Sequence, residues 1–346
     1  MMPAKKTQPE TMKKILAVMP SVKSHEIEYR NDEDLKKRIC EKFNIEENLV
    51  NLIFADKKKK NVVTDVESMT DAEIESIAKD NVERIVIVDY LWARQMIELG
   101  EGQFKLRKSS VTIVGAGALG NEVAKSLALL GFGSMKIIDF DTVEMSNLNR
   151  TLFTRDDIGK GKATALAGKI GMLYPYVNVK SFNKRVEECN DDELTSDVLI
   201  SALDNMMARI WLSTYARDHK IPLVDGGMKG LQARVQVVRD DSPCLACTIP
   251  LHKYGEVLEL KNPCQGMDDP KIPSYPTATS LVASVQANEA MKLIIGEPSL
   301  KGILVIDMRS NNFSVLKLNR NRKCFVCGEK QINTHNVFKV NTEGKE

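Results

Sequence analysis

The segment from Val111 to Arg150 constrains the fold of this chain more than any other. Four β-branched residues at 111–114 predict a short buried parallel strand, and a helix is expected over 121–130. Between them lies a G-x-G-x-x-G turn formed by Gly115, Gly117 and Gly120. Such a turn lets backbone N–H groups approach a phosphate, whose charge the helix N-terminus favours. The segment therefore predicts a nucleotide-binding α/β fold.

The next expected strand, 135–138, ends on Asp139, where an acid would hold a ribose hydroxyl. This pattern alone fits many dinucleotide-binding folds, and a nicotinamide dehydrogenase is the default interpretation. The polar residues that follow favour another class. Asn147 and Arg150 come just past the strand, and an enzyme that handles a triphosphate needs such groups whereas a dehydrogenase does not.

The string D-F-D-T-V-E-M-S-N-L-N-R at 139–150 resembles the adenylating domain of the ThiF/MoeB and ubiquitin-activating enzymes. The resemblance extends from about Tyr90 to about Gly328. Members of that family use ATP to activate the C-terminal glycine of a ubiquitin-like protein. The resemblance thus implies a Rossmann-like α/β adenylation domain with a mixed sheet at 90–330, acting on ATP and Mg²⁺.

The resemblance also implies which residues bind the nucleotide. Besides the three glycines these are Asp139 for the ribose, Asp141, and for the phosphates Asn147, Arg150 and Lys162. In the family a short helix carries an arginine followed by glutamine into the partner subunit's ATP site. Arg94, followed by a glutamine just before the glycine strand, fits that pattern and implies a homodimer.

Two of these assignments have alternatives in the sequence. Lys160 lies close to Lys162, but the resemblance selects Lys162, at the start of an alanine-rich helix where it suits developing phosphate charge. Asp204 ends a buried strand at 198–203, the edge where α/β sheets bind ligands, and the resemblance gives it Mg²⁺. Capping of the next helix is the other interpretation of Asp204.

Two C-x-x-C pairs provide a metal-binding pattern that needs no family knowledge. Cys244 and Cys247 form one pair, and Cys324 and Cys327 the other. Four thiolates can close a tetrahedral structural Zn²⁺ site that joins distant segments. Two redox pairs are the alternative, disfavoured because neither opens a thioredoxin-like βαβ unit.

Cys264 is the candidate nucleophile. It lies in the proline-broken segment 252–276 before a predicted helix at 279–295, and long connections in compact domains are usually functional. A thiol near a helix N-terminus can be activated. In compact ubiquitin-activating enzymes the thioester cysteine lies in this crossover region, although the spacer after Cys264 is longer than expected. An incidental thiol is the alternative. Cys189, in an acidic stretch, is expected to be a poor nucleophile.

Residues 12–89 predict a small α+β domain with the order strand, strand, helix, strand, short helix, strand. This order resembles the β-grasp, the ubiquitin-like fold. The domain has no terminal Gly-Gly, so it is not itself the activated substrate. It is expected either to pack as an accessory domain or to recruit a partner such as a conjugating enzyme. Residues 1–11 and 331–346 are expected to be polar tails.

The composition fits a cytoplasmic enzyme. The chain of 346 residues carries 49 basic and 47 acidic side chains, so nothing points to a nucleic-acid or membrane partner. Its seven cysteines favour metal or thiol chemistry in a reducing compartment over a disulfide framework. There is no apolar run long enough to span a membrane.

The predicted function is therefore ATP-dependent adenylation of a ubiquitin-like protein ending in Gly-Gly, followed by thioester formation on Cys264. One alternative is a MoeB- or ThiF-type adenylyltransferase that prepares a sulfur-carrier protein without a thioester. Another is a non-catalytic scaffold subunit, disfavoured because the arginine, lysine and aspartate positions are filled. The dehydrogenase explains the glycines but neither Arg150 nor Lys162.

Overall fold

The computed structural model describes residues 102–249 and 273–328, and before them four strands and a few helical positions. The predictions for Arg94, for Cys264 and for the tails 1–11 and 331–346 lie outside the described residues, as does most of the segment 252–276. The chain divides into two compact units, Met1–Lys108 and Ser109–Glu346. Each is described by itself.

The first unit contains a four-stranded sheet in the order β2-β1-β4-β3. Its central pair, β1 and β4, is parallel, and the flanking pairs are antiparallel. This is the strand arrangement expected of a β-grasp, as predicted. Helix α4 (Gly102–Lys108) is the last element of this unit. The predicted domain boundary at residue 89 stays a prediction. The strands are β1 (Lys13–Val18), β2 (Ser24–Tyr29), β3 (Ile53–Asp56) and β4 (Arg84–Ile87).

The second unit is built on an eight-stranded mixed sheet in the order β12-β11-β10-β9-β8-β5-β6-β7. The five strands from β7 to β9 are parallel, and β10, β11 and β12 continue the sheet in antiparallel fashion. The strands are β5 (Ser110–Val114), β6 (Ser134–Ile138), β7 (Asn178–Phe182), β8 (Val198–Ser201), β9 (Leu223–Lys229), β10 (Gln232–Val238), β11 (Ile303–Asp307) and β12 (Asn312–Leu316).

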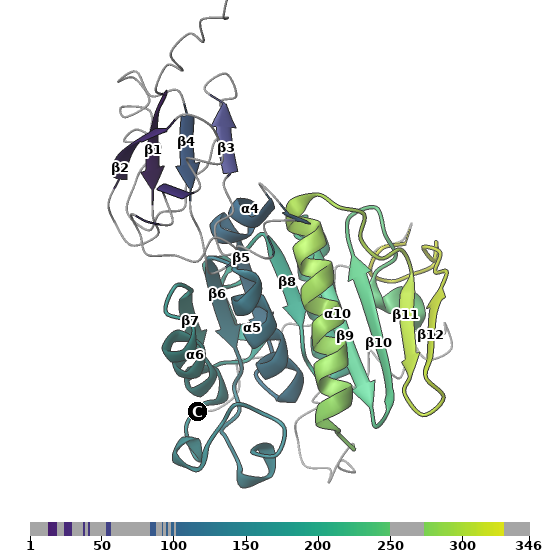
Figure 1. Ribbon diagram of the computed structural model, residues 1–346. Helices are drawn as coiled ribbons and strands as arrows, with labels where there is room; N and C mark the ends of the chain where they lie inside the picture. Colours follow the sequence, from purple (N-terminus) through teal and green to yellow (C-terminus); the bar gives the residue numbers. More distant parts are fainter. Residues whose placement is uncertain are drawn as a thin grey trace, which may run out of the picture. The chain divides into compact units, whose positions relative to one another are not determined.

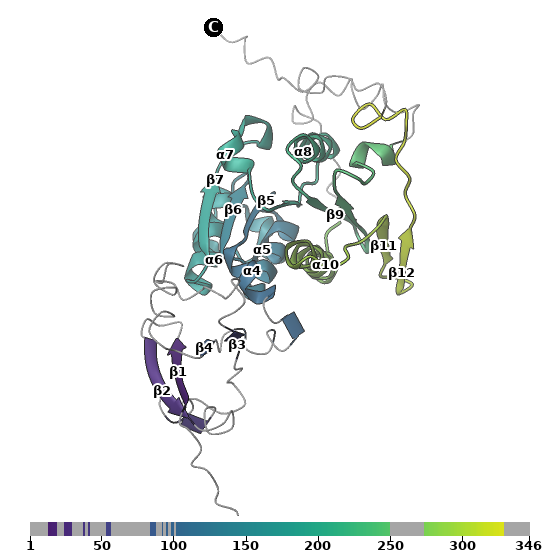
Figure 2. The same ribbon diagram turned by 90° about the horizontal axis from the view of Figure 1, so that it is seen from above.

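Helices cover both faces of this sheet (Figures 1 and 2). One face carries α5 (Ala118–Leu130), α6 (Lys162–Leu173) and α10 (Pro276–Ile295); the other carries α7 (Asp191–Leu194) and α8 (Met206–Asp218). This explains why β8 is buried along its whole length, since a central parallel strand is covered on both sides. None of the described helices combines the length and apolar character that a bilayer span requires.

The chain order creates a switch point between β5 and β8. From β5 the chain winds outward through β6 to β7, and it then returns to place β8 on the other side of β5. In such sheets ligands bind outside the carboxyl ends of the strands at this point. Ligand-binding groups are therefore expected in the loops after β5, β6 and β8.

A buried ion pair joins α8 to β9. Arg209 Nε donates to Asp225 Oδ1 at 2.8 Å, and its Nη2 donates to Oδ2. Arg209 is 6% exposed and Asp225 is fully buried. A Cβ on Gly227 would lie 2.8 Å from Arg209 Nη1, so glycine at this position makes room for the guanidinium.

We expect Asp225→Asn to lower the free energy of unfolding by about 3–5 kcal/mol, because it leaves the buried Arg209 charge uncompensated. Urea denaturation of the full chain measures this. Asp241→Asn is the matched control: Asp241 is 75% exposed in its pair with Arg239, so the loss there should stay below about 1 kcal/mol. Equal losses in both variants would contradict the prediction.

Candidate functional site

The three predicted glycines of the turn after β5 differ in what they do. Gly115 has a φ of +102°, and a Cβ there would lie 2.5 Å from the carbonyl oxygen of Ala202 in the loop after β8. A Cβ on Gly120 would lie 1.9 Å from the Gly115 carbonyl oxygen. Gly117 meets nothing within 4 Å. Two glycines thus allow close backbone packing, and the third leaves the N-terminus of α5 open, with the space that a phosphate needs.

Asp139 holds the turn from the end of β6. Its Oδ2 accepts the N–H of Ala116 at 2.6 Å and its Oδ1 accepts the N–H of Asp141 at 2.8 Å. Burial raises the pKa of the Asp139 carboxyl, although these donors partly offset the shift. Each oxygen retains a lone pair, so the residue fits the predicted ribose contact while it also shapes the turn.

Asn121, which the sequence analysis did not single out, joins the glycine turn to the segment that carries Arg150. It is fully buried, and its Nδ2 donates to the carbonyl oxygens of Ala116 and Gly117 at 2.8 and 2.9 Å. Its Oδ1 accepts the N–H of Leu152 at 3.1 Å. A polar residue on the buried face of a predicted helix was the signal that could have identified it.

Asn147 and Arg150 lie in one turn beyond β6, around the short 3₁₀ helix η2 (Met145–Asn147). Asn147 Oδ1 accepts the N–H of Glu144 at 2.9 Å. Arg150 Nη1 donates to the Ser146 carbonyl oxygen and, at 2.8 Å, to Asn149 Oδ1. Both predicted phosphate ligands therefore also stabilise the turn that presents them.

Lys162 and Asp141 are brought together from two different loops. Lys162, the first residue of α6, places Nζ 2.8 Å from Asp141 Oδ2, and its backbone N–H donates to the Asp141 carbonyl oxygen at 2.8 Å. The Lys162 side chain is 14% exposed, whereas Lys160 is 56% exposed and 3.4 Å from Asp157. Lys162 is thus the less exposed of the two lysines and is held beside Asp141.

Asp204 lies in the loop between β8 and α8, next to the glycine turn. The cap of α8 is Asn205, whose Oδ1 accepts the N–H groups of Met207 and Ala208 at 2.8 and 3.2 Å. The capping alternative for Asp204 is therefore wrong. Asp204 is exposed and makes no hydrogen bond within the described part of the chain, so its carboxylate fits a role in holding Mg²⁺ with phosphates.

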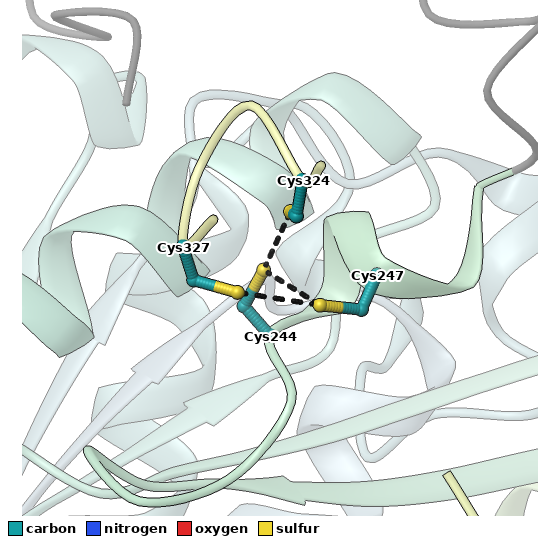
Figure 3. Close-up of side chains that lie close together, drawn as sticks. All are labelled: Cys244, Cys247, Cys324 and Cys327. Carbon is teal, nitrogen blue, oxygen red and sulfur yellow. Dashed lines mark hydrogen bonds between the residues drawn. The ribbon is translucent and has the colours of Figure 1, made fainter. Parts of the chain in front are cut away.

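The four predicted metal-binding cysteines meet in one cluster (Figure 3). Cys244 immediately precedes the 3₁₀ helix η5 (Leu245–Thr248) and Cys247 lies within it, while Cys324 and Cys327 follow β12. The Sγ–Sγ distances are 3.8 Å for Cys244–Cys247, 3.6 Å for Cys244–Cys324 and 3.3 Å for Cys247–Cys327. Tetrahedral zinc with Zn–S bonds of about 2.3 Å separates its sulfurs by roughly 3.8 Å, so the cluster fits Zn²⁺.

The surroundings of Cys189 disfavour its thiolate, through burial first and then through the acidic neighbours that the sequence shows. Burial, followed by the charge of Glu193, raises the pKa of the Cys189 thiol to about 12. Its Sγ lies 3.5 Å from the Arg185 carbonyl oxygen. The thiolate needed for nucleophilic chemistry is therefore scarce at neutral pH.

The chain is similar to several known proteins. Residues 92–326 match the sequence profile of the ThiF family. The SAMP-activating enzyme E1 of Haloferax volcanii is 35% identical over 240 residues, covering 68% of this chain and 86% of that protein. The molybdopterin-synthase adenylyltransferase of Salmonella typhimurium is 32% identical over 249 residues, covering 68% and 95%. The crystal structure of E. coli MccB with ATP has the same fold, with a TM-score of 0.58 and 22% identity over 69% of this chain and 73% of that one.

The two kinds of glycine predict two kinds of defect. Gly120→Ala should lower the melting temperature, because its Cβ would lie 1.9 Å from a backbone oxygen. Gly117→Ala should preserve the melting temperature and weaken ATP binding by about tenfold, because the methyl group enters the space left for phosphate. Calorimetry and ATP titration of both variants test this. An unchanged ATP affinity in Gly117→Ala would contradict the assignment.

The cysteine cluster predicts one tightly bound zinc per chain. Cys247→Ser should remove the metal and lower the melting temperature, because it takes away one of four thiolate ligands. Cys189→Ser, which replaces a cysteine outside the cluster, should retain it. Elemental analysis of the purified proteins gives the metal content. Full zinc in Cys247→Ser would contradict the four-cysteine site.

Proposed function

Because the chain belongs to the ThiF family, we propose that it is an adenylyltransferase that uses Mg·ATP to activate the C-terminal carboxylate of a ubiquitin-like or sulfur-carrier protein ending in Gly-Gly. The observation that carries the proposal is the convergence of the glycine turn, Lys162 and Asp204 on the carboxyl edge of the sheet at its switch point. A dehydrogenase would use the turn and Asp139 but has no need of the other two groups.

The proposed reaction needs no nucleophile from the chain. A carboxylate oxygen of the protein substrate forms a bond to the α-phosphorus of ATP, and the bond from that phosphorus to pyrophosphate breaks. The catalytic requirements are position and neutralisation of charge on the phosphates. Asp139 would hold the ribose, while Asn147, Arg150 and Lys162 would hold the phosphates. Asp204 would hold Mg²⁺, which would supply further charge neutralisation.

Lys162 is paired with Asp141, and this pair is part of the proposal. A phosphate that binds over the glycine turn competes with Asp141 for the lysine. The ion pair keeps Nζ positioned until a more highly charged partner arrives. Arg94 would complete the site from the second subunit of a homodimer.

Relatives of two kinds support two versions of the downstream step. One is called an activating enzyme E1 and another an adenylyltransferase. In the first version the Cys264 thiolate attacks the acyl carbon of the adenylate, a thioester forms and AMP leaves. In the second the adenylate passes to a sulfur donor and Cys264 has no role. We propose the first, with a cytoplasmic location and an N-terminal domain that packs as an accessory or recruits a conjugating enzyme.

The test is carrier-dependent exchange of pyrophosphate into ATP. The purified full chain is incubated with Mg·ATP and each β-grasp protein ending in Gly-Gly from the same organism. We expect exchange with at least one of them, which also excludes the scaffold alternative. Lys162→Ala should reduce kcat by about 100-fold or more, because an interaction aimed at developing phosphate charge is lost. The matched control, Lys160→Ala, removes an exposed lysine from the same loop and should stay within about twofold.

The same mixtures, analysed by intact mass without reductant, separate the two versions. A thiol-labile adduct that disappears in Cys264→Ala supports the thioester. Exchange without an adduct supports the sulfur-carrier version. Exchange that is equal in the two lysine variants would remove Lys162 from the mechanism.

A further inference from the structure

A second arginine, Arg234, lies next to the buried Arg209–Asp225 pair. In the sheet register Arg234 of β10 is directly opposite Gly227 of β9. A Cβ on Gly226 would meet Gln286 of α10, so Asp225 and Gly227 face the other way, towards α8. Residues opposite each other on neighbouring strands share a face, so Arg234 also lies on the α8 side, where Arg209 fills the space over Gly227.

The charges in this cluster do not balance. Both oxygens of Asp225 accept hydrogen bonds from Arg209, so this one carboxylate lies beside two arginines and the three side chains together carry a net positive charge. Arg234 Nη2 is buried and has no hydrogen-bond partner in the described part of the chain, and the same holds for Ser201 Oγ and Gln236 Oε1. Burial, followed by the charge of Arg209, lowers the pKa of Arg234. A buried guanidinium N–H group without an acceptor costs stability, so a ligand that supplies an anion is the expected complement.

The position of Arg234 along the sheet identifies the anion. Asp225 is level with Ser201, the last residue of β8, and Gly227 lies about 7 Å farther toward the carboxyl edge. Arg234 is thus level with the loop that carries Asp204. The cations assigned to the phosphates, Arg150 and Lys162, follow β6 on the opposite side of β5.

We propose that Arg234 binds the C-terminal carboxylate of the protein substrate and presents it to the α-phosphate. This rests on the proposed adenylation reaction, in which that carboxylate is the one anion other than ATP that must enter the site. The planar guanidinium can grip both carboxylate oxygens. When the acyl phosphate bond forms, the free carboxylate disappears and the arginine loses its partner. Arg234 therefore acts chiefly on substrate binding, so its loss raises the KM for the carrier more than it lowers kcat.

The test uses the carrier that gives pyrophosphate exchange, prepared with either a C-terminal acid or a C-terminal amide. Both are titrated into the enzyme without nucleotide. Wild type should bind the acid roughly 10- to 100-fold more tightly, the worth of a hydrogen bond to a charged group. Arg234→Gln should bind both forms with the affinity that wild type shows for the amide. Its ATP affinity should match wild type, and its melting temperature should be equal or higher, because an unpaired charge has been removed.

Arg239→Gln is the matched control, because it makes the same substitution just beyond the other end of β10, where Arg239 pairs with Asp241. It should keep the acid preference. An acid preference that survives in Arg234→Gln would overturn the inference, and a loss of ATP affinity in that variant would assign the guanidinium to the α-phosphate instead. A lower melting temperature of Arg234→Gln, with its preference for the C-terminal acid intact, would indicate that Arg234 has only a structural role. Absence of exchange with every carrier would refute the proposed function itself, before Arg234 is considered.

Discussion

The structure depends on the contact between two backbone turns at the switch point. The turn after β5 and the loop after β8 approach so closely at Gly115 and Ala202 that no side chain fits between them. This approach sets the glycine turn and the Asp204 loop side by side at one edge of the sheet. Among the described residues, Asp139 and the segment that carries Arg150 are attached to the glycine turn by hydrogen bonds, and Lys162 is attached to Asp141 beyond β6.

Asn121 and Asp139 carry this attachment outward by hydrogen bonds to backbone. Asp139 fastens the glycine turn to the end of β6, and Asn121 fastens it to the segment beyond Arg150. The polar atoms of both side chains are hydrogen-bonded to main-chain groups, as is usual for buried polar residues. The glycine turn, the end of β6 and the segment beyond Arg150 are therefore held together by hydrogen bonds within the chain, and such preorganisation lowers the cost of ordering a site on binding.

Much of this arrangement could be predicted from sequence because the relevant signals are local. The run at 111–114, the glycine spacing and the acid at Asp139 define a strand, a turn and a second strand within thirty residues of one another. The four cysteines were predicted to cluster because thiolate chemistry permits few other arrangements of two C-x-x-C pairs. The sequence did not identify Asn205 as the cap of α8. Because Asn205 takes that role, the Asp204 carboxylate is available for a ligand.

The remaining features depend on contacts between distant segments. Nothing near Arg234 in the sequence shows that Asp225 is already committed to Arg209, because that pairing follows from the sheet register and the placement of α8. Lys162 and Asp141, 21 positions apart, meet only because the loop between them folds back. Such residues have no period or spacing that distinguishes them from ordinary surface charges. The roles of Arg94 and Cys264 stay predictions.

The cysteine cluster has a consequence for the segment that carries Cys264. Cys244 and Cys324 are 80 positions apart, yet their sulfurs are 3.6 Å from each other. The chain between them is therefore a ring whose two ends meet at the cysteine cluster. A metal held by the four cysteines would fix the chain at Cys247, two residues before Ile249, and again at Cys324. Release of the metal, or oxidation of its thiolates, would open the ring and add the entropy of a long loop to the segment. Zinc occupancy and thiol redox state would then set how firmly the two cysteine pairs are held together.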